Sequence, residues 1–513
     1  MNQPHHREPS MLIKVMPLAL AAAMLAGCTL TPVVTTEAER QARVSSDQQA
    51  MFRDQEPVSG ELSFADVLAR AYQYNLENRV KLMENALLKS QLDLGFYDML
   101  PRLTAAAGYT TRNNDPGGTA MNLRTGVVQT DVSVAQERSR NTDQLTFSWN
   151  ALDFGLSYVR AQQSANQALI AEERRRKTLQ NITQEVYTAY WRAMAAQRWT
   201  AEIDRLHGVA ETALTDSKKI EEKRLMPPLQ ALIYQRGLLE IVQQLRSRRN
   251  ELESARIELA ALMNLRPGIA FRLKDSGAEP AMPPMLDVAA LPRIEDYALV
   301  NRAELREEDY RLRNSALEMR KTMLSILPGL SFDTGFQYDS NKYLYHNSWY
   351  ESGLRVSFNL FKAFSLPAAR RQHEAQVKVD DTRRAALTMA VMAQVRIAAE
   401  RYRQSIEEFE LARRLDGIDQ RINTQMANAV KSSAENELEA IRAQARAVLS
   451  SLQRANSQAA MQAAHARMLN SMGVDLAIPS QAASLADFSA GLDRSLQRWS
   501  VDQILRTQES SKP

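Results

Sequence analysis

The sequence predicts a mainly helical chain with a smaller β part, organised as two similar halves. Its 513 residues include only 18 glycines and 18 prolines, fewer than average usage of roughly 7% and 5% would supply. A chain so poor in turn-forming residues must use few, long elements. Apolar residues recur at helical spacing over long stretches, whereas four short segments alternate apolar and polar residues with the period of a β-strand.

The composition excludes several classes of function. The single cysteine leaves no disulfide framework and no multi-thiolate metal site. The 64 basic and 60 acidic side chains give a net charge of +4 without a clustered basic face, so we expect no nucleic-acid partner. Two of the six histidines, His5 and His6, leave with the expected signal peptide and the other four are far apart, and no nucleophile or phosphate-binding motif is found. We therefore expect no enzyme, no cofactor and no membrane-spanning helix in the mature chain.

The N-terminal residues 1–27 have the pattern of a secretory signal peptide, with a basic start, a short apolar stretch and small residues at the end. The segment Leu25-Ala26-Gly27-Cys28 resembles a bacterial lipobox, which implies cleavage before Cys28 and a covalent lipid, palmitate included, on that cysteine. Translation starts at Met1 or Met11. Because Thr29 rather than an aspartate follows the cysteine, the resemblance implies an anchor in the inner leaflet of the outer membrane.

The first half of the mature chain follows a short tether. We expect residues 28–60 to form an extended, lipidated tether, and residues 61–265 to form the first structural repeat. Its expected elements are a helix from Leu62 to about Tyr97, strands at about 102–112 and 143–151, a long helix over 156–224, a tip at about 224–229 and a return helix over 229–263. Heptad spacing in the long helices predicts side-by-side helix pairing, and Pro227-Pro228 forces the turn between them.

The second half repeats the order of the first. A linker at 266–292, rich in glycine and proline, separates the two halves, and residues 293–475 form the second structural repeat. Its expected elements are a helix over 294–325, strands at about 329–339 and 349–360, a long helix over 368–430, a tip at about 431–438 and a return helix to Met472. Residues 476–513 form a C-terminal extension, helical around 492–505.

Positions 209 residues apart correspond from the second strand onward. The identical pairs are Ser148/Ser357, Asn150/Asn359, Gln163/Gln372, Arg174/Arg383, Arg192/Arg401, Leu229/Leu438 and Met263/Met472. These identities are sparse. The shared order of helix, strand, loop, strand, long helix and return helix is the stronger indication of a duplicated unit.

The strands constrain the assembly. Each is about ten residues long, the length that crosses a membrane as a tilted strand. Four strands cannot close, and an open sheet edge cannot lie in lipid, so spanning strands require an oligomer. Three chains would give twelve strands, whereas two would give eight, with an interior filled by side chains. The apolar faces carry Phe147, Trp149, Phe332, Phe336, Tyr338, Tyr350 and Phe358. A soluble sheet packed on a helix would also alternate and is the alternative.

Several features together resemble the outer membrane factor family, the TolC-like channels. They are the lipobox, the duplicated long hairpins, the Leu-Pro before strands at 100–101 and 327–328, and the Ser-x-Asn strand ends at 148–150 and 357–359. The resemblance covers roughly residues 61–475. It implies a homotrimer in which a twelve-stranded β-barrel in the outer membrane continues into an α-helical barrel in the periplasm.

The resemblance also implies partners and a function. The partners would be a periplasmic adaptor (membrane fusion) protein and an inner-membrane pump of the RND or ABC type. The chain would be a passive exit duct for small molecules such as drugs and toxic compounds. Two alternatives stay open, namely a channel for type I protein or peptide secretion and a lipid-anchored coiled-coil scaffold without a pore.

In that family the helical tips close the pore and meet the adaptor. The candidate adaptor contacts are Arg224, Leu225, Lys431 and Ser432. Glu439, together with Glu435, is the candidate pore constriction, because carboxylates converging on a trimer axis raise one another's pKa and favour cations. A solvated glutamate near the start of a helix is the alternative for Glu439. Pro228 and Gln230 depart from the polar and acidic residues of the family pattern, and the usual glycine near each tip is missing.

Overall fold

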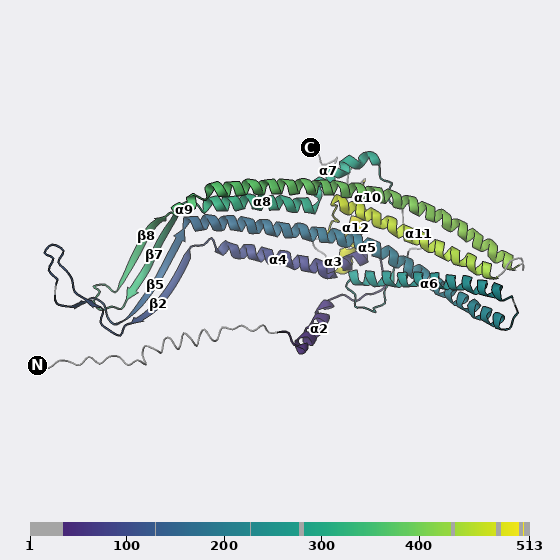
Figure 1. Cartoon of the computed structure of the whole chain (residues 1–513), viewed down its shortest axis with the longest axis horizontal. Coiled ribbons are helices and arrows are strands. Elements are labelled where there is room, and N and C mark those ends of the chain that lie inside the picture. The colour runs from purple at the N-terminus through teal and green to yellow at the C-terminus, as the bar shows by residue number, and fades with distance from the viewer. Residues whose placement is uncertain are drawn as a thin grey trace. The chain divides into compact units, whose positions relative to one another are not determined.

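The computed structural model describes residues 34–128, 130–225, 227–275, 282–431, 437–478, 484–501 and 506. The side chains of Val288, Lys431 and Glu437 also lie outside this description. The chain divides into two compact units, Met1–Gln55 and Glu56–Pro513, which are described separately (Figure 1).

The first unit contains one described helix, α2 (Glu37–Met51), in a region where the sequence analysis expected an extended tether. A capping box starts this helix: the Thr36 hydroxyl accepts from the Glu39 N–H at 3.3 Å, and the Glu39 carboxylate accepts from the Thr36 N–H at 2.7 Å. These two bonds satisfy N–H groups that a helix start otherwise leaves without partners. The expectation of an extended tether was therefore wrong for these residues.

Long helices and one four-stranded sheet build most of the second unit. Up to the first return helix its elements are β1 (Glu61–Leu62), α3 (Phe64–Tyr74), α4 (Leu76–Tyr97), β2 (Arg102–Thr111), β3 (Gly117–Gly118), β4 (Ser133–Val134), β5 (Ser139–Asn150), α5 (Ala151–Glu222) and α6 (Pro228–Leu262). The remainder comprises β6 (Arg272–Leu273), the short 3₁₀ helix η1 (Val288–Ala290), α7 (Leu291–Asn301), α8 (Ala303–Leu324), β7 (Gly329–Asp339), β8 (Ser348–Ser357), α9 (Leu360–Ala363), α10 (Leu366–Lys431), α11 (Glu437–Met472) and α12 (Leu485–Leu496). Both halves thus run in the predicted order, while the duplication itself stays a prediction.

Two helices that the sequence predicts as continuous are each broken by one residue. Asn75 has extended backbone angles of −60° and 125°, ends α3 and caps α4 by accepting from the Glu77 and Asn78 N–H groups. Arg302 has almost the same angles, −64° and 128°, between α7 and α8. A single extended residue leaves the apolar period nearly unchanged, so the period alone did not show either break.

The longest helix, α5, has 72 residues and begins directly where β5 ends. Asn150 makes this junction, because its side chain accepts from the Leu152 and Asp153 N–H groups at 2.9 and 3.2 Å. At about 1.5 Å per residue, α5 is roughly 110 Å long. The helix therefore carries the chain from the sheet to the tip between α5 and α6 (Figure 1).

The four-stranded sheet is antiparallel throughout, in the order β2-β5-β7-β8. Two further sheets have strands of only two residues each, the parallel pair β1–β6 and the antiparallel pair β3–β4. These pairs were not predicted, because a strand of two residues shows no alternation in the sequence. The predicted helix at 492–505 also begins earlier than expected, since α12 spans Leu485–Leu496.

The buried apolar residues form two main clusters. The larger lies where α3, α5, α7, α10, α11 and the C-terminal residues meet, and includes Leu68, Ile182, Ile294 and Leu469. The second lies toward the tips, where α5 and α6 pack against α11. Because both clusters join elements from the two halves of the chain, burial of these side chains holds the halves together.

Candidate channel surfaces

The two faces of the four-stranded sheet have opposite character. Residues paired across strands lie on the same face, and one such row is Ala105, Leu145, Phe336 and Tyr350. The face that includes this row carries the exposed apolar side chains Leu103, Tyr109, Leu145, Phe147, Trp149, Leu330, Phe332, Phe336, Tyr338, Tyr350, Leu354 and Val356. The predicted alternation is thus confirmed, and the apolar face is not packed against a helix as in a soluble sheet.

The opposite face is polar and more enclosed. Along β5 and β7 most of its residues are less exposed than their apolar neighbours on the other face. Arg140 on β5 forms an ion pair with Asp339 on β7 at 2.9 Å, and the Asp339 side chain is 10% exposed. A sheet whose apolar face is the open one has the polarity of a membrane barrel wall rather than of a soluble core.

Among the described residues, both edges of this layer lack a neighbouring strand or helix. Strands β2 and β8 are the edges of the sheet, and α4 and α10 are the ends of a helical row in which α4 contacts α5, α5 contacts α8 and α8 contacts α10. Exposed apolar side chains follow the two end helices, at Val80, Met83, Leu87 and Leu94 on α4, and at Met389, Ile397, Leu411, Leu415, Ile418 and Ile422 on α10. Free strand edges and apolar helix stripes are the surfaces on which further chains pair.

A charged hollow of about 500 Å³ lies where the sheet meets the helices. Its charged lining residues are Asp98, Arg102, Asp153, Arg160, Asp333 and Arg355. Across the described part of the chain none of the six has an ion-pair partner within 4 Å. This cluster was not predictable from the sequence, because its residues come from widely separated elements.

The tip between α5 and α6 places two of the predicted adaptor-contact residues at the surface. Arg224 has a positive φ of 53°, and the Leu225 N–H donates to the Ile220 carbonyl at 3.0 Å, which ends the helix. A glycine is usual at this position, and the left-handed backbone conformation costs a residue with a Cβ atom about 1–2 kcal/mol. The Leu225 side chain is 71% exposed, as is expected of a contact residue rather than a core residue.

At the tip between α10 and α11 the structure describes only part of the predicted site. The side chain of Lys431, and all of Ser432 and Glu435, lie outside the described residues. Glu439 is described, and its carboxylate accepts from Arg442 Nη1 at 2.5 Å. This ion pair, which was not predicted, neutralises part of the charge that a carboxylate ring would need.

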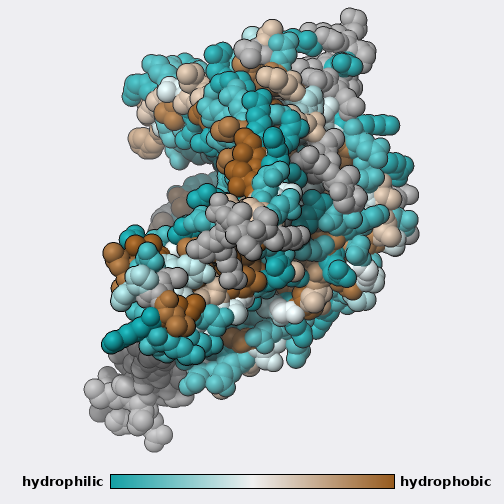
Figure 2. Space-filling view, turned by 90° about the vertical axis from the view of Figure 1, so that its right-hand side faces the viewer, coloured by the Kyte–Doolittle hydropathy of each residue, from teal (hydrophilic) through white to brown (hydrophobic). Residues whose placement is uncertain are grey.

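The Arg442 guanidinium also lies against α6. A Cβ atom added at Gly237 of α6 would be only 2.5 Å from Arg442 Nη2. The side chain that compensates Glu439 therefore also fills the space beside a glycine of the other hairpin. Figure 2, which looks onto the tip end of the long helices, shows a largely hydrophilic surface with separate hydrophobic patches.

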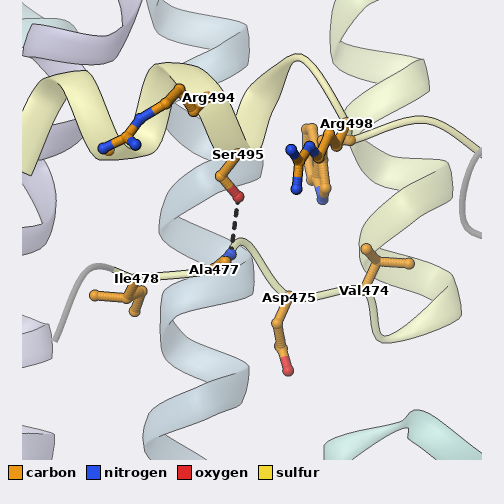
Figure 3. A pocket seen from close by; sticks show the side chains of 9 residues that line it. Val474, Asp475, Ala477, Ile478, Arg494, Ser495 and Arg498 are labelled. Atoms are coloured by element: carbon orange, nitrogen blue, oxygen red, sulfur yellow. Dashed lines mark hydrogen bonds between the residues drawn. The ribbon is translucent and has the colours of Figure 1, made fainter.

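Within the second unit, the segment after α11 and helix α12 lie beside another hollow (Figure 3). This hollow, of about 470 Å³, lies between the segment after α11 and helix α12. The Ala477 N–H donates to the Ser495 hydroxyl at 2.9 Å. Asp475 forms an ion pair with Arg176 and accepts from Gln180 Nε2 at 2.7 Å, which fixes this segment on α5.

In the parts of the chain that the structure describes, no group of three or more His, Cys, Asp or Glu side chains is placed to hold a metal ion. His465 is buried beside the rings of Tyr402 and Trp499, and burial lowers the pKa of its imidazole to about 4. The neutral side chain is thus a packing element. No helix among the described residues is both long and apolar enough to cross a membrane. Cys28 lies outside the described residues.

Comparison with solved structures shows several channels of the same fold. The outer-membrane channel OprN superposes with a TM-score of 0.60 at 16% identity, over 80% of this chain and 89% of its own. The Campylobacter jejuni CmeC outer membrane channel gives a TM-score of 0.60 at 11% identity, over 82% and 90%. The outer membrane protein VceC of Vibrio cholerae gives 0.57 at 12% identity, over 80% and 96%.

The chain has the TolC-like channel fold. The predicted resemblance is therefore confirmed at the level of the fold. No family model matches the sequence, and no curated protein does. Within the TolC-like fold the four strands and the helical tips are at opposite ends of the long helices, which separates the sheet from the predicted adaptor contacts (Figure 1).

Proposed function

We propose that the chain is the outer-membrane exit duct of a tripartite export system for small molecules. Three copies would form a twelve-stranded barrel and a periplasmic helical barrel. The tips would dock onto an adaptor protein, and an RND or ABC pump in the inner membrane would supply the energy. The duct itself would be passive, without an enzymatic activity or a cofactor.

The observation that carries the proposal is the open apolar face of the sheet. In a soluble protein the apolar face would be covered by a helix and the polar face would meet water. Here the described residues place apolar side chains on the uncovered face and the Arg140–Asp339 pair on the enclosed one. Lipid is the solvent that such a surface fits.

The free edges support a closed homo-oligomer. Each chain has one edge formed by β2 and α4 and another formed by β8 and α10. A head-to-tail contact of these unlike edges uses the same interface repeatedly, and it closes into a ring when the rotation allows. Three chains would supply twelve strands, which leaves an aqueous lumen where eight would not.

The tips and the N-terminus support the remaining parts of the proposal. Arg224 and Leu225 lie at an exposed helical turn, as a contact with an adaptor requires. Lys431, Ser432, Glu435 and Glu439 are proposed to complete the second tip, with Glu439 and Glu435 near the constriction. A lipid on Cys28 would hold the chain on the inner leaflet of the outer membrane without spanning it.

Single-channel recording in a planar bilayer tests the proposal. The purified full chain is expected to give stepwise conductance, and Glu439→Ala is expected to raise its open probability by removing a charged group from the constriction. The matched control is Glu407→Ala, which removes a glutamate that is likewise paired with a nearby arginine, Arg403, at 2.6 Å. Absence of conductance from both the wild type and Glu439→Ala would overturn the channel in favour of a scaffold.

A further inference from the structure

A hollow of about 260 Å³, lined by residues of both halves of the chain, is surrounded by basic side chains. Its lining residues come from α5, from the link between α7 and α8, from α10 and from α11, and they are Lys177, Gln184, Arg302, Gln394, Ile397, Ala398, Arg401, Arg467, Asn470 and Ser471. Four of them are cationic and none is a carboxylate. All of them belong to one chain, so the hollow is complete without an oligomer.

The two arginines at its rim stand where the first half of the chain has a salt bridge. Arg192 on α5 donates to Glu258 on α6 at 2.6 Å. The residues 209 positions later are Arg401 on α10 and Arg467 on α11. Because arginine replaces glutamate at the second position, a stabilising pair of opposite charges becomes two like charges facing one hollow.

Two further positions change in the same direction. One is the extended residue between two helices in each half, Asn75 and Arg302, and the other is the pair 209 residues apart, Glu185 and Gln394. Asn75 Nδ2 donates to the Leu262 carbonyl at 3.4 Å, and Arg302 Nη1 donates to the Ser471 carbonyl at 3.0 Å, although one residue is neutral and the other cationic. Gln394 occupies the position that corresponds to Glu185. The first half therefore places two carboxylates and one cation at these four positions, whereas the second half places three cations and no carboxylate.

The basic charge is only partly compensated within the chain. Glu304 pairs with Lys177 at 3.1 Å and with Arg302 at 2.8 Å. Burial, followed by the nearby charge of Arg302, lowers the pKa of the Lys177 ammonium. Across the described residues, Arg401 and Arg467 have no carboxylate within 4 Å. One carboxylate is thus paired with two of the four cations and the other two have none, which leaves an excess of positive charge around the hollow.

We propose that this hollow binds an oxyanion of the phosphate class. Arginine side chains recognise such oxygens with paired N–H donors, and Lys177 adds a further donor. Asn470 Oδ1 accepts from the Lys177 ammonium at 2.9 Å, and Gln394 Oε1 accepts from Arg302 Nη2 at 2.7 Å, so the part-buried lysine and the buried arginine are already oriented. This binding site does not depend on the proposed channel function. A single chain in detergent could bind the anion whether or not the assembled protein forms a conducting channel.

Arg467→Glu is the decisive variant, because it gives Arg401 a glutamate partner like the one that Arg192 has in Glu258. We expect it to form an ion pair with Arg401 and to weaken inorganic phosphate binding at least tenfold in isothermal titration of the full chain. The matched control is Arg446→Glu, an exposed arginine on the same helix that does not line the hollow. It makes the same change of charge and should bind phosphate as the wild type does.

Three probes separate the possible sources of the anion. Inorganic phosphate should bind, and chloride at the same ionic strength should not displace it. Dimethyl phosphate, a diester like a phospholipid headgroup, should bind as tightly as inorganic phosphate if a lipid is the source, and at least tenfold more weakly if a free phosphate or monoester is. The proposal would be overturned if the wild type bound neither inorganic phosphate nor dimethyl phosphate. It would also be overturned if the wild type and Arg467→Glu bound phosphate equally.

Discussion

Phe336→Arg is expected to remove the protein from the outer membrane, while Gln337→Arg is expected to leave it there. The two residues are neighbours on β7 but lie on opposite faces, as their partners Leu145 and Gln144 on β5 show. Phe336 is 38% exposed on the apolar face. An arginine on the lipid side of a membrane barrel costs about 2–4 kcal/mol near the midplane, and three chains would bear that cost three times.

The measurement is the fraction of each variant that sediments with outer membranes and resists extraction by alkaline carbonate. For Phe336→Arg this fraction should fall severalfold or more, with the protein degraded or found in the soluble fraction. Gln337→Arg carries the same new charge and should match the wild type, because the polar face already holds Arg140. Equal membrane recovery of the two variants would contradict a lipid-facing apolar surface.

Leu245→Ala is expected to loosen the helical tips, whereas Leu239→Ala on the same helix should have little effect. Leu245 is fully buried in the cluster that joins α5, α6 and α11, while Leu239 is 52% exposed. Removing a buried leucine side chain costs about 2–5 kcal/mol, because transferred apolar surface is lost and a cavity remains. Truncating an exposed leucine loses little buried apolar surface and leaves no cavity.

Hydrogen exchange by mass spectrometry measures this effect where it arises. In Leu245→Ala the peptides of α6 and of the facing part of α11 should exchange at least tenfold faster, while those of the four-stranded sheet should not change. Leu239→Ala should exchange like the wild type. Unchanged protection of α6 in Leu245→Ala would mean that this cluster does not hold the hairpins together.

The sequence was sufficient for the long elements, because each is long enough to show its period. Both strand pairs, the long helices and the alternation of faces were predicted within a few residues. The breaks at Asn75 and Arg302 were not, since one extended residue hardly alters a helical period. The helix α2 was missed for a different reason, because a short helix without a buried face shows no apolar stripe.

The candidate sites were less predictable than the elements that carry them. The Glu439–Arg442 pair could have been expected from its spacing of three residues on a helix. The charged hollow beside the sheet could not, because residues such as Asp98 and Arg355 are far apart in sequence. The basic hollow left one signal in the sequence: Arg192 and Arg401 match, while the partner Glu258 is replaced by Arg467.

The central claim is that the apolar face of the four-stranded sheet contacts lipid and the polar face does not. Two native tryptophans test it. Trp149 and Trp349 are 36% and 39% exposed, yet the first lies in the row of Phe332 on the apolar face and the second in the row of Gln337 on the polar face. Two variants that each retain one of them, with the other four tryptophans changed to phenylalanine, are reconstituted into vesicles containing lipids brominated at several depths.

Brominated acyl chains should quench Trp149 fluorescence strongly and Trp349 fluorescence weakly, while aqueous acrylamide should show the reverse preference. Comparing several bromine depths separates the effect of a tryptophan's depth in the membrane from the effect of the face on which it lies. Equal quenching of both tryptophans by lipid, or stronger lipid quenching of Trp349, would contradict an apolar-out sheet in the membrane.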